Sequence, residues 1–292
     1  MASAAIPDAG STPNYARRAR WSGWALHALI AVICAFTIFP FLWMFSTAFK
    51  PADEVFTQDL RLVANNPTWH NFPDAFDYFP VANWLWNSFG IAAITTAGKI
   101  AISLPAAFAF ARLRFRGDKL LFAMVLATMI VPGIVTVVPN YILISDLGWM
   151  NRWIAVIVPS LPGTAFFVFL LRQNILQLPQ ELLDAARIDG ASTFKLLVQI
   201  VTPNIKPAIA VVTILAFLGM WNQYLWPLLV LNDFEAKTLA TGMPFFTNNA
   251  ESAQMWGPMM ATATIATLPP LILYIVAQKQ IIDTFVTSGL KG

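Results

Sequence analysis

The chain has 292 residues, of which 58% are hydrophobic and 11% are charged, with 18 Lys and Arg against 15 Asp and Glu. Soluble domains carry about 25% charged residues, so this composition excludes a soluble protein with a single core. The mean hydropathy of +0.63 indicates a protein whose solvent is lipid, while 14 Gly, one Cys and a net charge of +3 exclude collagenous, disulfide-rich and nucleic-acid-binding classes.

Six apolar segments are each long enough to cross about 30 Å of hydrocarbon, so we expect an all-α membrane protein with six transmembrane helices. In chain order they are Trp24–Phe45, Trp86–Phe110, Leu120–Tyr141, Trp153–Leu171, Ala208–Val230 and Trp256–Ala277. The first is too long and too aromatic for a cleaved signal peptide. We expect a permease body at residues 24–282, between an N-terminal tail at 1–23 and a C-terminal tail at 283–292.

The basic residues predict the orientation of these segments. If the N-terminus is inside, 13 of the 18 Lys and Arg fall in inner connections and termini, and four fall in outer loops. Inner loops of membrane proteins are enriched in Lys and Arg. We therefore expect both termini to be cytoplasmic in a multi-pass protein of the plasma membrane.

The second segment contains the remaining basic residue, Lys99. It lies eleven residues before Phe110, about 16 Å from the inner end of a helix, and a charge at that depth costs at least about 2.5–3.5 kcal/mol. One interpretation is a cation on the substrate path, suited to an anionic group such as a phosphate. The other is an ion pair or carbonyl contact with a companion subunit. Gly98-Lys99 is no phosphate-binding loop, because Ala93 and Ile100 break that motif.

The longest inner connection, residues 172–207, predicts a helix-turn-helix unit at 178–202. Pro179 suits a first helical turn, Glu181 and Asp184 place acid near its positive end, and Gly190 suits a left-handed cap. A second helix is expected from Ser192 to Val201. We expect an apolar stripe on the first helix formed by Leu182, Ala185, Ala186 and Ile188. Such a unit on the cytoplasmic face fits contact with a soluble partner.

The fifth segment contains a polar run, Asn222, Gln223 and Tyr224, between Trp221 and Trp226. Amide, phenol and indole groups together hydrogen-bond and stack on a polyol. We interpret these residues as candidates for the substrate path. The alternative is a gate or a packing role.

The inner connection also carries a resemblance to a known family. Residues 184–191 read Asp-Ala-Ala-Arg-Ile-Asp-Gly-Ala, followed by Pro203 and Pro207. This run resembles the EAA coupling motif of bacterial ABC-importer permeases, with Asp184 where Glu is usual. The resemblance implies a set of residues that couple the chain to an ATPase: Glu181, Asp184, Ala185, Ala186, Asp189, Gly190, Ala191 and, in the C-terminal tail, Ser288 and Gly289.

The resemblance extends from about Ala25 to Gly292 and is to MalG-type permeases of carbohydrate importers. Supporting runs are Asn87-Ser88, residues 111–117, 169–173, 221–227 and 287–292. In that family the permease pairs with a second homologous permease, two ATP-binding subunits and an extracytoplasmic substrate-binding protein. ATP and Mg are then bound by the ATPase subunits, and we expect no cofactor in this chain.

Several substrates and mechanisms stay open at this stage. Lys99 with the run at 221–224 looks most like permease subunits of glycerol-3-phosphate and glycerophosphodiester importers (UgpE type), and the alternative is a neutral di- or oligosaccharide such as maltose or trehalose. An ion-coupled secondary carrier is disfavoured, because carriers usually place acidic residues or His in the membrane. Two His and one Cys predict neither an intramembrane enzyme nor a metal site.

Overall fold

The structure is a computed structural model that describes residues 14–57, 61–248 and 253–289, in which every regular element is a helix. The all-α prediction is therefore confirmed for these residues. The elements are α1 (Asn14–Ala48), α2 (Ala52–Val55), α3 (Asn71–Tyr78), α4 (Val81–Arg112), α5 (Asp118–Ala127), η1 (Thr128–Ile130), η2 (Gly133–Thr136), α6 (Val137–Asp146), α7 (Trp153–Ser160), α8 (Ala165–Leu176), α9 (Gln180–Ile188), α10 (Thr193–Lys195), η3 (Leu196–Val201), α11 (Thr202–Asn204), α12 (Lys206–Trp221), α13 (Leu225–Val230), α14 (Leu239–Gly242), α15 (Pro244–Asn248), η4 (Ala253–Met255) and α16 (Trp256–Gly289).

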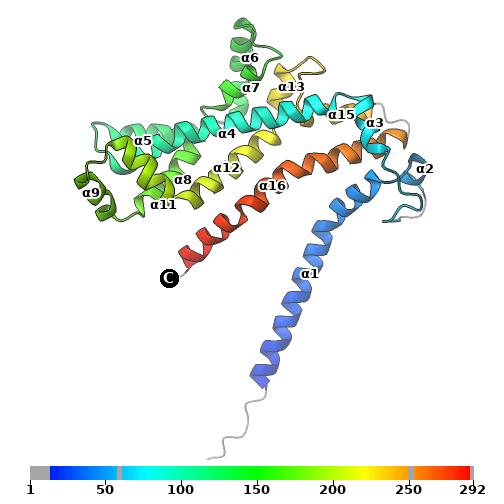
Figure 1. The fold of residues 1–292 in the computed structure, drawn as a ribbon, viewed down its shortest axis with the longest axis horizontal. Coiled ribbons are helices and arrows are strands. Elements are labelled where there is room, and N and C mark those ends of the chain that lie inside the picture. Colours follow the sequence, from blue (N-terminus) through cyan, green and yellow to red (C-terminus); the bar gives the residue numbers. More distant parts are fainter. Residues whose placement is uncertain (1–13, 58–60, 249–252, 290–292) are drawn as a thin grey trace, which may run out of the picture.

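Helix α4 is central to the fold: it packs along both α8 and α12, and α12 also packs against α16. Figure 1 shows α4, α12 and α16 running in roughly the same direction, with α9 at one end of this layer. Helix α1 contacts α16 and diverges from it, so most of its length lies away from the other helices. Large apolar side chains of α1 are accordingly exposed, which fits a helix surrounded by lipid or a partner.

The membrane-spanning segments are less regular than the sequence predicts. Among the described residues, three helical stretches are long and apolar enough to cross a membrane alone: Leu26–Ala48, Val81–Arg112 and Trp256–Lys279. The last two contain the expected second and sixth spans, and the first overlaps the expected first span, Trp24–Phe45, from its third residue on. Three further candidates are helix pairs with a sharp bend, so six crossings result only if each bent pair forms one span.

The expected spans at Leu120–Tyr141, Trp153–Leu171 and Ala208–Val230 are not single continuous helices: the first two contain a sharp bend, and the third is interrupted between α12 and α13. The bends measure 88° between Asp118–Ile130 and Gly133–Asp146, 51° between Trp153–Ser160 and Ala165–Leu176, and 84° between Thr193–Asn204 and Lys206–Trp221. Proline removes a helical hydrogen bond and glycine lowers helix propensity, and the first two breaks contain Pro132-Gly133 and Pro162-Gly163. The third bend lies just before the expected fifth span, in which α12 ends at Trp221 and α13 begins at Leu225.

Both predicted tails are more helical than expected. Helix α1 already begins at Asn14, within the expected tail at 1–23, and α16 continues to Gly289. Ser288 and Gly289 therefore lie in the last turn of α16, and their side chains are outside the described part of the structure.

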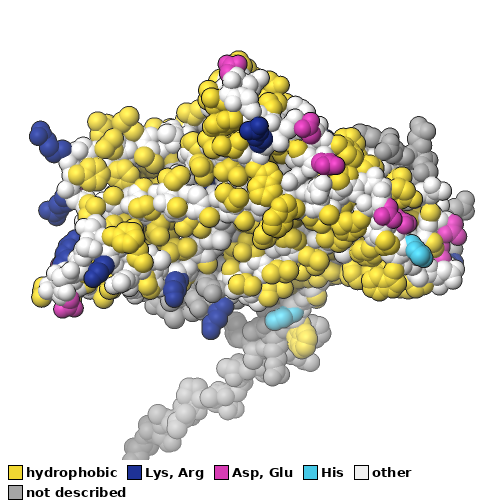
Figure 2. All heavy atoms as spheres, turned by 45° about the horizontal axis from the view of Figure 1, so that its top comes forward, with side chains coloured by type: hydrophobic (Ala, Val, Ile, Leu, Met, Phe, Trp, Pro, Cys, Tyr) yellow, Lys and Arg dark blue, Asp and Glu magenta, His cyan; other side chains and the backbone are white. Residues whose placement is uncertain are grey.

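Two apolar cores hold the helices together. One contains Trp84 and Phe246 and lies where α4 meets the loops after α13, and the other contains Leu171, Leu183 and Val201 near α9. The charged side chains are unevenly distributed between these two regions. In Figure 2 most Lys and Arg lie at the end of the molecule that holds α9, and most Asp and Glu lie elsewhere. The second core therefore anchors the predicted helix-turn-helix unit to the basic end of the molecule.

The contact between Trp84 and Gly242 gives a first testable prediction. A Cβ added to Gly242 would lie 2.3 Å from an atom of the Trp84 ring, and Trp84 is fully buried and donates from its indole nitrogen to the Phe234 carbonyl oxygen at 2.8 Å. Overpacking a filled core costs about 1–3 kcal/mol. We expect Gly242→Ala to lower the melting temperature of the purified protein, whereas Gly219→Ala, where a Cβ meets nothing within 4 Å, should leave it unchanged or raise it. Equal effects would contradict this packing.

Candidate coupling segment and translocation cavity

The segment 178–202 forms the helix-turn-helix unit that its sequence predicts. Helix α9 begins directly after Pro179, and Gly190 takes the left-handed conformation with φ of +78°, which ends the helix. The amide nitrogen of Ala191 donates to the Ala186 carbonyl oxygen at 2.9 Å and closes the turn. The Ser192 side chain then caps the next helical stretch by accepting from the amide of Lys195.

The faces of α9 differ from the predicted ones. Leu183 is fully buried in the core beneath it, whereas Leu182 and Ala185 are exposed and Ile188 is 87% exposed. The residues of the expected apolar stripe therefore lie mostly on the surface, and α9 packs inward through Leu183. Ile188 and Phe194, which is 73% exposed, leave two large apolar side chains on the surface of the unit.

Most of the expected coupling residues in this segment lie on its outer surface. Glu181, Asp184, Ala185, Asp189 and Gly190 are exposed, and Ala186 and Ala191 are half-buried against the inner core. Ala185 and Ala186 are neighbours in α9, and their small side chains add little bulk to the surface of the helix. A partner protein can therefore approach this helix closely.

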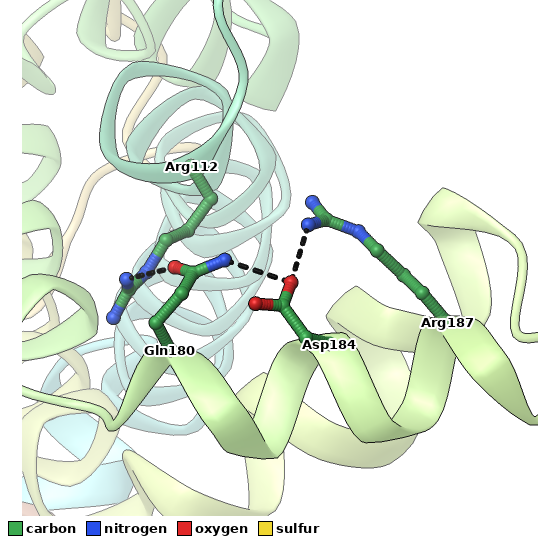
Figure 3. A network of polar contacts seen from close by, with 4 residues as sticks. All are labelled: Arg112, Gln180, Asp184 and Arg187. Carbon is green, nitrogen blue, oxygen red and sulfur yellow. Dashed lines mark hydrogen bonds and ion pairs between the residues drawn. The ribbon is translucent and has the colours of Figure 1, made fainter.

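A chain of polar contacts runs along α9 and reaches α4 (Figure 3). The Asp184 carboxylate accepts from the side-chain amide of Gln180 and from the guanidinium of Arg187, each at 3.0 Å. The side-chain oxygen of Gln180 accepts in turn from Arg112 at 2.8 Å. Asp184 thus fixes the side chain that links α9 to the last residue of α4.

The breaks in the helices surround a cavity of about 770 Å³. Its lining includes Val131 and Gly133 from one break, Pro162 and Gly163 from the second, and Gln223 from the gap between α12 and α13. Helix breaks at membrane depth are tolerated where they are buried in protein or line a water-filled cavity, and interrupted helices often form binding sites. The three helix breaks therefore line one cavity.

Polar side chains without internal partners line this cavity. Lys99 lies in it, with its ammonium nitrogen 5.8 Å from the centre of the Phe167 ring, and this ammonium group makes no hydrogen bond or ion pair with the described residues. The side-chain oxygen of Gln223 is buried and lacks a hydrogen-bond partner among the described residues. Asn140 from α6 joins them in the lining. Together they offer one cation and two amide groups to a solute.

The structure separates the other predicted path residues. Of the run at 222–224, only Gln223 lines the cavity, whereas Asn222 and Tyr224 are exposed at the break after α12. Sequence reasoning missed Asn140, Thr128, Thr136 and Ser160, which also line it. The Pro-Gly pairs inside the expected third and fourth spans were the signal for these residues.

Comparison with known proteins identifies a family and several relatives of this chain. Residues 99–284 match the family described as binding-protein-dependent transport system inner membrane component. The chain is 32% identical over 268 residues to the sn-glycerol-3-phosphate transport system permease protein UgpE of Pectobacterium atrosepticum, covering 90% of this chain and 95% of that protein. It is 36% identical over 204 residues to the protein of the same name from Brucella melitensis biotype 1, covering 70% and 72%.

Solved structures share the fold. A bacterial ABC transporter involved in the import of the acidic polysaccharide alginate superposes with a TM-score of 0.79 at 21% identity, over 92% of this chain and 100% of that chain. A bacterial alginate ABC transporter in complex with an alginate pentasaccharide-bound periplasmic protein gives a TM-score of 0.65 at 16% identity, over 89% and 94%. At these identities the likeness is one of fold.

Proposed function

The chain belongs to the family of binding-protein-dependent transport system inner membrane components, and from this premise we propose that it is the permease subunit of an ATP-driven importer of glycerol-3-phosphate or its diesters. The observation that carries the proposal is the cavity with Lys99, an ammonium group that no described acid neutralises. A phosphate ester supplies the missing negative charge, and its hydroxyl groups suit the amides of Gln223 and Asn140.

In this proposal, partner subunits hydrolyse the ATP that drives transport. Two ATP-binding subunits bind below the pair of permeases, and one of them docks on segment 178–202, where Ile188 and Phe194 provide apolar contact and Ala185 and Ala186 allow close approach. ATP and Mg are bound by those subunits. A second homologous permease completes the cavity, and an extracytoplasmic binding protein delivers the solute. In support, one solved structure with this fold is an alginate transporter in complex with an alginate pentasaccharide-bound periplasmic protein. ATP-driven closure of the ATPase pair moves α9 and turns the cavity from inward- to outward-facing.

The test of this function is uptake by the reconstituted complex. Proteoliposomes containing the chain, its partner permease, the ATPase subunits and the binding protein should take up radiolabelled glycerol-3-phosphate only with ATP. Maltose measured in the same vesicles is the control for the neutral-saccharide alternative. Maltose uptake without glycerol-3-phosphate uptake would replace the proposed substrate, and uptake driven by a proton or sodium gradient without ATP would favour the ion-coupled carrier.

The proposed orientation places both termini in the cytoplasm, because Lys and Arg are enriched in the connections on that side. In a Cys34→Ala background, we expect Val63→Cys to react with a membrane-impermeant thiol reagent in intact cells. Thr193→Cys should react only after the membrane is opened. Val63 and Thr193 are both exposed in the fold, so a difference in labelling reports the side of the membrane and not burial of the side chain. The opposite labelling pattern would reverse the topology.

A further inference from the structure

The inner ends of α4 and α8 are joined by two arginines that the proposed function leaves unassigned. Arg112, the last residue of α4, donates through one guanidinium nitrogen to the carbonyl oxygen of Ile175 at 2.7 Å and to that of Leu178. Its other terminal nitrogen donates to the side-chain oxygen of Gln180 at 2.8 Å. One side chain of α4 thus holds the end of α8 and the first residue of α9.

Arg172 makes the reverse connection. It lies on α8 and donates from Nε to the carbonyl oxygen of Phe110, in the last turn of α4, at 3.1 Å. Its guanidinium carbon lies 4.4 Å from the centre of the Phe122 ring on α5. The two helices are therefore cross-linked in both directions at the basic end of the molecule.

The chemistry of helix ends explains why arginine suits these positions. The last four carbonyl groups of a helix have no donor within it, and a cation near them is favoured by the helix dipole. Arginine has five donors in a planar fork, so it can serve several carbonyls at once, whereas lysine provides a single ammonium centre. Arg112 uses this capacity to satisfy carbonyls at the junction between α8 and α9 while its own backbone stays in α4.

The contacts of Arg112 connect α9 to the helix that carries Lys99. Gln180 is the first residue of α9, and Asp184 and Arg187 fix its side chain from the following turn (Figure 3). Arg112 lies on the same helix as Lys99, 13 residues further on, which is about 20 Å at helical rise. A displacement of α9 can therefore be passed through the side chain of Arg112 to the helix that carries the cavity lysine.

We propose that Arg112 is a positioning residue for transport, which transmits movement of the coupling helix α9 to α4 through Gln180 and the carbonyl groups at the end of α8. The inference rests on the proposed function, because it requires a partner that moves α9. Arg112 itself touches neither substrate nor ATP. Its loss leaves the cavity and the docking surface in place but separates their movements.

The experiment compares Arg112→Gln with Arg114→Gln in the fully reconstituted complex. Arg114 is exposed, lies two residues beyond the end of α4 and makes no hydrogen bond or ion pair in the described part of the chain, so its replacement removes the same charge without removing a contact. The readout is solute transported per ATP hydrolysed, which a merely structural loss of assembled complex does not change. We expect this ratio to fall about tenfold in Arg112→Gln, as for a lost charged hydrogen-bond network, and to stay at the wild-type value in Arg114→Gln.

A second variant keeps the test decisive if Arg112→Gln assembles poorly. Gln180→Ala removes the side-chain link from the exposed side of α9, and we expect its transport per ATP to fall in the same direction by a smaller factor. Wild-type ratios in assembled Gln180→Ala and Arg112→Gln would overturn the inference while leaving the importer function intact. A wild-type complex that hydrolyses ATP without any uptake would instead overturn the proposed function.

Discussion

Replacing Lys99 with Met should lower glycerol-3-phosphate uptake at least about tenfold, because a phosphate then loses its only cationic partner in the described cavity lining. Methionine is also unbranched and lacks only the terminal atom of the lysine chain, so most of the side-chain volume is kept. It also removes the cost of a charge at membrane depth, at least about 2.5–3.5 kcal/mol, so the variant should insert as well as the wild type. The measurement is initial uptake rate against substrate concentration in proteoliposomes.

Two controls separate charge from packing at this position. Lys99→Arg keeps a cation and should retain most of the uptake, whereas Asn140→Leu removes a neutral polar group from the same cavity and should cost less than Lys99→Met. If Lys99→Met reduced the uptake of a neutral saccharide as strongly as that of glycerol-3-phosphate, the lysine would act structurally. The anion argument would then be lost.

Replacing Gly190 with Pro should uncouple ATP hydrolysis from transport. Gly190 has φ of +78° and donates its amide to the Arg187 carbonyl oxygen at 3.0 Å, and proline has neither that dihedral angle nor an amide hydrogen. The change costs about 3 kcal/mol or more in the turn, so α9 should leave its position relative to α10. We expect uptake to fall at least about tenfold while the reconstituted complex still hydrolyses ATP.

Gly190→Asn is the matched control for this turn, because asparagine tolerates the left-handed conformation and a Cβ at this site meets nothing within 4 Å. It should transport at close to the wild-type rate. Uptake in Gly190→Pro equal to that in Gly190→Asn, with equal amounts of assembled complex, would remove the coupling role of the segment.

Local sequence signals predict the coupling unit well, because Pro179, Gly190 and Ser192 act through their immediate backbone. The expected apolar stripe does not show which face α9 buries, because Leu183 lies outside it. Which of Leu182 and Leu183 packs inward depends on α8 and the helical stretch after Ser192, and hydrophobicity alone does not distinguish two adjacent leucines. Tertiary contacts decide that choice.

The cavity is harder to predict, because its residues come from helices that meet only in the fold. Lys99 was identifiable by its cost in lipid, and Gln223 by its polar run. Asn140 joins them only because the chain breaks at Pro132-Gly133 and turns by 88°, so that α6 leaves the direction of α5. Length and hydropathy predict a crossing there and give no information about a bend within it.

The most direct test of the account is the accessibility of the cavity in the two nucleotide states. In a Cys34→Ala background, Thr136→Cys places a thiol on the lining of the cavity. The account predicts that an impermeant reagent added outside labels it faster when the ATPase subunits are locked with ATP and vanadate, and that Gly190→Pro abolishes the increase. A labelling rate that does not change with nucleotide state in the wild-type segment would contradict it.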